Sequence, residues 1–285
     1  MAKTVYEIIT EEIIKKLELG VAPWRKPWKP GYEAISWKTG NQYRGINTLL
    51  TEPGGEYATW KQITEAGGRI KPGEAKNSTM IVYYGEGKEK NNDGDEEKKY
   101  RFLKYYRVYN VTTQVEGLEL RRDYPDENAE SNLERIEAAE KLVADFMDKP
   151  DIVYKSGGAV YNSNFDRVTV PPLSDYEVAE EYYCTLFHEL VHSTGHEDRL
   201  NRKFGKRFAD VPYSKEELVA EIGAAMLCGV AGIEQKIIDN SVAYLDSWIK
   251  VLKKDSKLIV TASSEAQKAA DYIQNIKKSS VKAAG

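Results

Sequence analysis

One short pattern constrains this chain more than any other: residues 188–192 read His-Glu-Leu-Val-His, which is the H-E-x-x-H pattern. On an α-helix, residues at i and i+4 share one face, so His188 and His192 can point at a single ion. Glu189 stands one residue further round, where its carboxylate reaches a water on that ion rather than the ion itself. Neutral imidazole is a good zinc ligand, and zinc lowers the pKa of a bound water to about 7. The pattern therefore predicts Zn²⁺ held by His188 and His192, with Glu189 as general base.

The neighbouring residues predict a helix that carries this pattern near its end. Over residues 176–187 apolar side chains recur at helical spacing, and acids occupy the first turn. Ser174 and Asp175 are suited to cap its start, and Gly195 is suited to a left-handed conformation at its end. All three histidines of the chain lie within 188–196, and this clustering favours a metal site over a solvated helix face.

A second predicted helix, over residues 214–228, offers acids for the third ligand position. Ser214 is suited to cap it, and Glu217 and Glu221 lie at i and i+4 on one face. The small residues 223–225 would let it pack closely against the first helix. In gluzincin peptidases the ligand glutamate is followed four residues later by an acid that bonds a ligand histidine, so we assign Glu217 as ligand and Glu221 as that supporting acid. The reverse assignment, and a capping box on a solvated face, are the open alternatives.

Two further side chains are expected to act on the carbonyl oxygen of a bound peptide. His196 lies closer to the pattern than the third histidine of metzincins does, so it is not expected to be that ligand. His196 or Tyr213 is instead expected to donate to the oxyanion. Cys184 lies one turn before His188, but Cys184 and Cys228 are expected to be reduced thiols in the core. A structural metal site would be closed by a fourth ligand such as His196 or Cys184, whereas a catalytic site keeps a water there.

The composition is that of a globular protein with one large or two ordinary domains. The 285 residues are 41% hydrophobic and 30% charged. No stretch approaches the ~20 apolar residues of a membrane helix, and the start of the chain lacks the apolar core of a secretory signal. A net charge of −4 excludes a nucleic-acid coat over the whole molecule but allows a local basic groove. We therefore expect a cytoplasmic monomer with no membrane contact.

The N-terminal half interleaves aromatic residues with cations. An amphipathic helix is predicted over residues 4–19, followed by an extended, proline-rich segment over 22–30. Strands over 80–84 and 100–111 are expected to form a long hairpin around a charged loop at 86–99, with Arg101, Lys104 and Arg107 lining a face beside tyrosines. Bases of a single strand stack on aromatic rings while cations meet phosphates, so this half predicts a single-stranded DNA site; a tryptophan core with a solvated lysine rim is the alternative. The residues expected to contact DNA are Trp24, Arg25, Lys26, Trp28, Tyr43, Arg44, Asn47, Lys61, Arg101 and Arg107.

A polar, charged segment over residues 117–130 marks the expected domain boundary. We expect an α+β chain: a small mixed α/β DNA-binding domain with antiparallel strands over 1–122, and a zincin-like domain over 130–285. The second domain would contain a small antiparallel sheet, the H-E-x-x-H helix, and further helices over 234–254 and 262–277. An edge strand of that sheet would hold an extended peptide by main-chain pairing.

Together these motifs resemble the ArdC-type antirestriction proteins, which are carried by conjugative plasmids, integrative elements and phages. The resemblance covers nearly the whole chain and rests on Pro23-Trp24 and Pro27-Trp28, Tyr43–Asn47, Trp60–Gln62, Phe187–His196, Arg199-Leu200, Glu216–Glu221 and Ala262–Ala270. It implies an N-terminal domain that binds single-stranded DNA, a C-terminal zinc metallopeptidase domain acting on an unidentified protein, and protection of incoming DNA from host restriction. The alternative is a DNA-binding protein that protects by occupancy and carries a structural or inactive zinc site.

Overall fold

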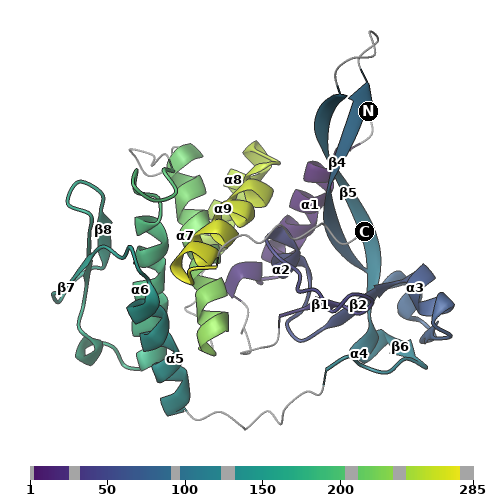
Figure 1. The fold of residues 1–285 in the computed structure, drawn as a ribbon, viewed down its shortest axis with the longest axis horizontal. Helices are drawn as coiled ribbons and strands as arrows, with labels where there is room; N and C mark the ends of the chain where they lie inside the picture. Colours follow the sequence, from purple (N-terminus) through teal and green to yellow (C-terminus); the bar gives the residue numbers. More distant parts are fainter. Residues whose placement is uncertain are drawn as a thin grey trace. The chain divides into compact units, whose positions relative to one another are not determined.

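The computed structural model describes residues 3–25, 33–90, 97–122, 132–202, 211–233 and 242–276. Contacts divide the chain into two compact units, which are described separately below (Figure 1). The mixture of helices and sheets confirms the expected α+β class. Within the described ranges, no helix is both long and apolar enough to cross a membrane.

A four-stranded sheet in the order β1-β2-β5-β4 forms the centre of the first unit. β4 (Thr79–Lys90) and β5 (Glu97–Asn110) pair as the long antiparallel hairpin that the sequence predicts, and the hairpin is seen in Figure 1. β2 (Glu56–Thr59) pairs antiparallel with β5, and β1 (Ile35–Ser36) pairs parallel with β2. β4 is therefore an edge strand of this sheet.

Short helices and a two-stranded ribbon complete the first unit. They are α2 (Ile46–Leu50), α3 (Trp60–Glu65), the 3-10 turn η2 (Glu74–Lys76), α4 (Val111–Gln114), and the paired strands β3 (Arg69–Ile70) and β6 (Val115–Glu116). A capping box lies at the start of α3. The backbone N–H of Gln62 donates to Thr59 Oγ1, and the backbone N–H of Thr59 donates to the side-chain oxygen of Gln62. Ile63 on α3 packs with Ala58 and Tyr109 in a buried cluster, which ties this helix to the sheet.

The second unit is mostly helical and includes residues 6–32 of the N-terminal region. Its helices are α1 (Val5–Glu18), η1 (Pro23–Arg25), α5 (Asn132–Asp145), η3 (Leu173–Asp175), α6 (Ala179–Ser193), α7 (Val211–Ala231), α8 (Val242–Lys254) and α9 (Leu258–Ile273). Residues 6–32 group with this unit rather than with residues 33–123. Thr10 Oγ1 on α1 donates a 2.7 Å bond to the carbonyl of Ser256 in the turn between α8 and α9. The division into a DNA-binding domain over 1–122 and a peptidase domain over 130–285 stays a prediction about function.

Helices α6 and α7 pack side by side, and this contact builds the site described below (Figure 1). A Cβ at Gly223 of α7 would lie 2.9 Å from both methyl carbons of Val191 on α6. Real Cβ atoms do not come that close to other atoms, so a glycine is needed here. Ala224 and Ala225 are buried beside it. The expectation that small residues at 223–225 allow close packing is confirmed.

Some of the predicted helix ends are wrong. Ser174 and Asp175 lie in η3, and α6 begins later, at Ala179, without a side-chain cap. Gly195 is not among the residues with a left-handed backbone; the chain leaves α6 through a tight turn in which His196 N donates to Ser193 O. Ser214 lies inside α7, which begins at Val211, so it cannot be the N-cap.

A three-stranded sheet in the order β7-β9-β8 accompanies α6. β8 (Val160–Asn162) pairs antiparallel with β9 (Arg167–Val170), as expected, but β7 (Asp151–Tyr154) pairs parallel with β9. The expectation of a wholly antiparallel sheet is therefore wrong. The connection over residues 155–166 is long enough for the crossover that a parallel pair requires, and it places β8 on the far side of β9.

Candidate metal centre

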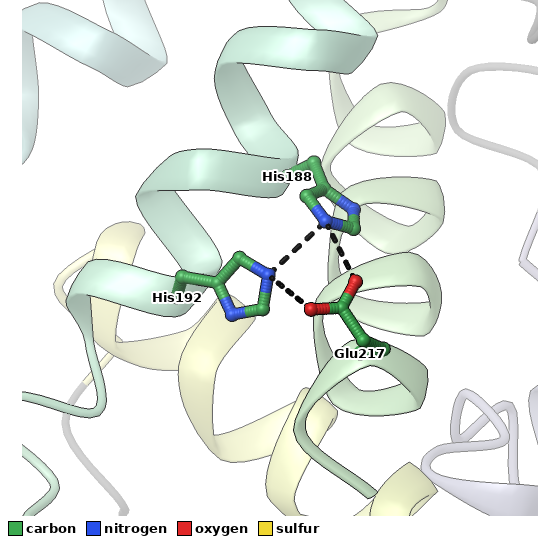
Figure 2. Close-up of side chains that lie close together, drawn as sticks. All are labelled: His188, His192 and Glu217. Carbon is green, nitrogen blue, oxygen red and sulfur yellow. Dashed lines mark hydrogen bonds and ion pairs between the residues drawn. The ribbon is translucent and has the colours of Figure 1, made fainter. Parts of the chain in front are cut away.

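The H-E-x-x-H pattern lies in the last turns of α6, and a glutamate of α7 faces it (Figure 2). The Nε2 atoms of His188 and His192 are 3.1 Å apart, and each lies 3.6 Å from one carboxylate oxygen of Glu217. In a tetrahedral zinc site with bonds of about 2.0–2.1 Å, neighbouring ligand atoms are roughly 3.3–3.4 Å apart. The three side chains thus present two nitrogens and a carboxylate at the spacing of metal ligands.

The donor set is suited to a divalent transition metal. Imidazole and carboxylate groups are both common ligands of zinc. Carboxylates and other oxygen donors also suit manganese. All three side chains are partly exposed, so solvent or substrate can reach them. Groups of three or more His, Cys, Asp or Glu side chains can hold a metal when their ligand atoms lie close together. Among the described residues, this trio is the group whose ligand atoms all lie within 4.8 Å of one another.

The histidines lie in a strongly negative environment. Burial lowers the pKa of His188, but the hydrogen bond that it donates to Glu217 and the charges of Glu189 and Glu221 raise it more, so the net shift is upward. Glu189 itself is buried, on the turn of α6 between the two histidines. A divalent cation would neutralise this surplus of negative charge, so the electrostatics agree with the donor geometry.

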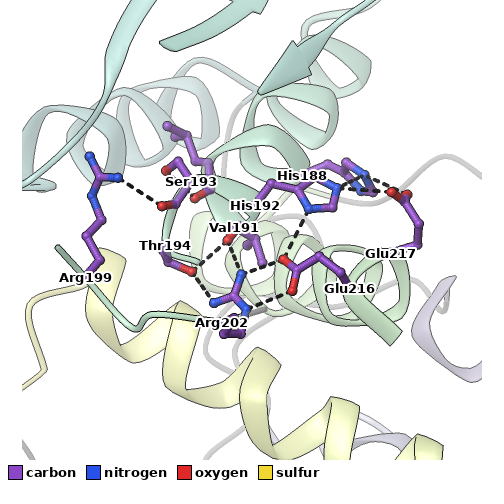
Figure 3. Close-up of polar contacts among 10 residues, drawn as sticks. His188, Val191, His192, Ser193, Thr194, Arg199, Arg202, Glu216 and Glu217 are labelled. Carbon is purple, nitrogen blue, oxygen red and sulfur yellow. Dashed lines mark hydrogen bonds and ion pairs between the residues drawn. The ribbon is translucent and has the colours of Figure 1, made fainter. Parts of the chain in front are cut away.

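Glu216, which was not predicted from the sequence to act at this site, contacts the ring of His192 (Figure 3). Glu216 Oε1 lies 3.2 Å from Nδ1 of His192, the ring nitrogen away from His188 and Glu217. Arg202 donates 2.7 and 3.0 Å bonds to the two oxygens of Glu216. Arg202 also donates to Thr194 Oγ1 and to the carbonyl oxygen of Val191, at 2.7 and 2.8 Å. One guanidinium thus joins the end of α6 to α7.

The Arg202–Glu216 pair keeps a carboxylate beside Nδ1 of His192. Both side chains are 7% exposed. Burial alone would raise the pKa of Glu216, but the hydrogen bonds from Arg202 and His192 hold it below its ordinary value. An ionised Glu216 can accept a hydrogen bond here only from Nδ1–H, so this contact favours the His192 tautomer whose Nε2 lone pair points toward His188 and Glu217. Sequence reasoning gave this role to Glu221, whose assignment stays a prediction.

A second arginine fastens the turn after α6 to the small sheet. Arg199 makes 2.6 and 2.8 Å bonds to the carboxylate of Asp166. It also donates a 3.0 Å bond to the carbonyl of Ser193 (Figure 3). Tyr161 on β8 donates to the same Asp166 at 2.9 Å. The Arg199 bonds hold the pKa of Asp166 below its ordinary value. Neither arginine was predicted to act at the site, although Arg199-Leu200 belongs to the motif that carried the resemblance.

The other predicted residues of this site lie outside the ligand trio. His196 is in the turn after α6, where its Nδ1 accepts a 3.3 Å bond from the amide nitrogen of Asp198. Cys184 and Cys228 are unbridged, with their sulfur atoms 3.0 Å apart between α6 and α7, in accord with reduced thiols in the core. Tyr213 lies in α7, but its side chain is outside the described residues. Within the ranges that the structure describes, neither His196 nor Cys184 belongs to the trio.

The predicted DNA contacts fall into several groups. The prediction that Trp24 contacts DNA is wrong, because this side chain is fully buried. Its Nε1 donates to Tyr244 OH at 2.9 Å, and its ring packs edge-on against Trp248. A base cannot stack on a ring that has no exposed face. Lys26, Trp28 and the side chain of Arg25 lie outside the described residues.

Asn47 and Tyr43 have structural partners in the first unit. The Asn47 amide donates to the carbonyl of Val82 at 2.8 Å and accepts from its N–H at 2.7 Å, which pairs the exposed edge of β4. Tyr43 is half-buried and packs edge-on against Tyr57. Both residues therefore hold the sheet, and their contact with DNA stays a prediction.

The predicted cations of this unit are exposed. Arg44 is exposed, Lys61 lies 3.6 Å from Glu65, and Arg101 lies 3.2 Å from Glu86. Arg107 donates a long 3.4 Å bond to the carbonyl of Ser78. Exposed ion pairs of this kind contribute at most about 1 kcal/mol, so these cations can exchange partners.

Lys104 does not line the same face as Arg101 and Arg107. Side chains alternate along a strand, and Lys104 is three residues from each arginine. The expectation that all three line one face is therefore wrong.

Two family models match the chain. The zincin-like metallopeptidase model matches residues 137–265, and the model of the N-terminal domain of anti-restriction factor ArdC matches residues 3–109. The DNA primase TraC of Escherichia coli is 30% identical over 293 residues, which cover 95% of this chain. The match covers 20% of the primase, so this chain spans about a fifth of that relative.

Two solved structures of the antirestriction protein ArdC from plasmid R388 have the same fold as this chain over nearly the whole length of the chain. The metal-free structure is 34% identical, with a TM-score of 0.74, and the match covers 97% of this chain and 100% of that chain. The Mn(II)-bound structure is 32% identical, with a TM-score of 0.72, and the match covers 96% of this chain and 98% of that chain. The chain belongs to the ArdC family of antirestriction proteins.

Proposed function

We propose that this antirestriction protein binds single-stranded DNA and hydrolyses peptide bonds at a zinc centre formed by His188, His192 and Glu217. The observation that carries the proposal is the convergence of two Nε2 atoms and a carboxylate at 3.1 and 3.6 Å, next to a buried glutamate. A glutamate between two ligand histidines is the arrangement that zinc peptidases use for general-base catalysis. The Mn(II)-bound relative supports a divalent metal in this family.

Each residue has a distinct role in the proposed reaction. His188, His192 and Glu217 hold the metal, which when bound supplies a Lewis acid and lowers the pKa of a water. Glu189 takes a proton from the attacking water and later delivers it to the leaving amine. Glu216 positions the His192 ring through Nδ1, and Arg202 holds Glu216 in its charged form. His196 and Tyr213 are proposed as donors to the oxyanion, and Glu221 as a further supporting acid.

The substrate peptide is proposed to bind in extended form along an edge of the three-stranded sheet. In the order β7-β9-β8, both β7 and β8 are edge strands, and β8 contacts α6. Main-chain pairing with β8 would therefore carry the scissile bond toward α6 and leave the choice of sequence to the side-chain positions.

The experiment that tests the peptidase is a comparison of the parent with Glu189→Gln. Both proteins are loaded with zinc, metal content is measured by plasma mass spectrometry, and cleavage of a casein mixture is followed with and without single-stranded DNA. The variant should bind equal metal and cleave about 10²–10⁴-fold more slowly, because the general base is lost while the ligands stay. Equal cleavage by both proteins at equal metal content would remove Glu189 from the mechanism.

Protection by DNA occupancy is the second candidate function. The exposed tyrosines and cations of the β4–β5 hairpin favour it, because they suit stacking and phosphate contact without any chemistry. A transfer assay into a restricting recipient separates the two functions. Full protection by Glu189→Gln supports occupancy, whereas loss of protection with DNA binding intact supports proteolysis.

A further inference from the structure

We propose that one face of the β4–β5 hairpin is the surface on which the bases of single-stranded DNA stack, an inference that rests on the DNA binding proposed above. We call this surface the ladder face and define it by Tyr83, Tyr100, Phe102, Lys104 and Tyr106. None of these residues was listed among the DNA contacts expected from the sequence, although Lys104 was expected to line a sheet face with Arg101 and Arg107.

Strand register places these residues on one side of the hairpin. Residues directly opposite one another in an antiparallel pair share a face, as do residues two apart on one strand. Tyr83 lies opposite Lys104, and Phe102 and Tyr106 flank Lys104 at two residues on either side. Tyr100 continues the same alternation. By the same rule Tyr84, Arg101 and Tyr105 lie on the other face.

The aromatic rings form a continuous row with a regular spacing. Ring centroids are 6.1 Å apart from Tyr100 to Phe102, 6.5 Å from Phe102 to Tyr83, and 6.3 Å from Tyr83 to Tyr106. Stacked DNA rises by about 3.4 Å per nucleotide on each strand, so consecutive rings are too far apart for bases that stay stacked on one another. The spacing of the rings fits a single DNA strand whose neighbouring bases are unstacked from one another. A duplex could present such bases only if its base pairs opened. The spacing therefore favours single-stranded DNA over duplex.

Two glycines of β4 leave room for aromatic rings of β5 to pack against that strand. A Cβ at Gly85 would come within 2.2 Å of the Phe102 ring, and one at Gly87 within 2.4 Å of the Tyr100 ring. The two rings therefore occupy the space where a side chain of β4 would stand. A ring packed against the strand in this way loses little conformational freedom when a base stacks on it. Tyr100 and Tyr106 keep 48% and 44% of their surface exposed, which is enough for stacking.

Charge distinguishes this face from the opposite one. Lys104 Nζ lies 4.8 Å above the Phe102 ring, in the middle of the row. Among the described side chains of the hairpin, residues 79–87 and 100–110, the ladder face carries Lys104 and no acid, whereas the other face carries Glu86 beside Arg101. A phosphate on the ladder face meets a cation without a neighbouring carboxylate, so charge complementarity selects this face.

The test compares two matched pairs of tyrosines in the full-length protein. Tyr100→Ala/Tyr106→Ala removes two rings from the ladder face, and Tyr84→Ala/Tyr105→Ala removes two rings of similar exposure, 51% and 42%, from the other face. Binding to a fluorescein-labelled oligo-dT strand of about 16 nucleotides, the upper site size of a single-strand-binding fold, is followed by anisotropy. The ladder pair should weaken binding by at least about 20-fold, since each stacked base is worth roughly 5- to 150-fold, and the control pair by less than about 2-fold. Tyr100→Phe/Tyr106→Phe should bind like the parent, because the rings stay.

A salt titration gives a second readout that does not depend on removing rings. Lys104→Gln should make the slope of log affinity against log salt shallower by about 0.7, the value for one phosphate contact on a single strand. Lys141→Gln on α5 is the matched control and should leave the slope unchanged. Equal losses in both tyrosine pairs, or a parental slope for Lys104→Gln, overturn the inference while DNA binding stands. A parent that does not bind the strand at all removes the proposed DNA binding and this inference with it.

Discussion

Replacing Glu216 by glutamine tests whether the Arg202–Glu216 pair orients His192. The substitution keeps the size and shape of the side chain but removes its charge. Arg202, 7% exposed, would then be buried beside a neutral amide, and the Nδ1–H of His192 would lose its charged acceptor. Removing one partner of a buried pair costs about 3–5 kcal/mol, and we expect the lower end because the amide oxygen still accepts one bond. Loss of an acid that orients a ligand histidine typically weakens metal binding by about 10–100-fold.

Two assays measure these losses separately. Urea unfolding in the presence of a chelator gives the stability of the metal-free protein, which should fall by about 3 kcal/mol. Competition with a fluorescent zinc chelator gives the zinc affinity, which should fall by about 10–100-fold. Glu221→Gln is the matched control on the same helix. Its charge acts on His188 from a distance, so zinc affinity should change by no more than about a factor of five.

Zinc affinity within twofold of the parent for Glu216→Gln, together with a large loss for Glu221→Gln, would refute this reasoning. The acid that orients a ligand histidine would then be Glu221, and the contact between Glu216 and His192 would serve stability alone.

Further predictions concern stability, pH and metal removal. Gly223→Ala should destabilise the protein by about 1–3 kcal/mol in urea unfolding, because its Cβ would meet Val191 at 2.9 Å; a stabilised variant would contradict the tight packing of α6 on α7. Trp24→Ala should cost about 3–5 kcal/mol of stability yet leave the affinity of the folded protein for single-stranded DNA unchanged, since the ring is buried; a selective loss of binding would restore Trp24 to the DNA site. Burial alone would raise the pKa of Glu216, but its hydrogen bonds with Arg202 and His192 hold the pKa below the ordinary 4.5 in the folded protein. As the pH falls, the Glu216 carboxylate is therefore protonated in the unfolded chain before it is protonated in the folded one. Stability should therefore be full above about pH 4.5 and decline below it, and Glu216→Gln should flatten that decline in acid titrations. Chelation of the metal should abolish peptide cleavage while leaving anisotropy with single-stranded DNA unchanged, and parallel loss of both would contradict a separate DNA surface.

Local patterns explain which features could be predicted from the sequence. Helical periodicity placed His188 and His192 on one face of α6, and the glycine and alanines of α7 indicated the close approach of that helix. The alternating strands at 80–84 and 100–111 predicted the β4–β5 hairpin. Each of these predictions depends on residues within one or two elements, where spacing alone determines geometry.

The features that were missed depend on contacts between distant residues or on the path of a turn. Trp24 is buried by Tyr244 and Trp248, more than two hundred residues later, and no local pattern reports such a contact. Arg202 reaches Glu216 only because the chain turns back after α6. β7 pairs parallel with β9 because the chain crosses over through β8, which short strands do not reveal. The ladder face required the register of β4 against β5, since composition alone did not separate the two sides of the hairpin.

X-ray absorption at the zinc edge of the stoichiometrically loaded protein tests the central claim most directly. The claim is that His188, His192 and Glu217 hold one divalent metal and leave a position open for water. The spectrum should show about four nitrogen or oxygen scatterers near 2.0–2.1 Å, with the multiple scattering of two imidazoles and no sulfur. A sulfur shell near 2.3 Å, the signal of three imidazoles, or failure to retain one metal per chain would contradict the account.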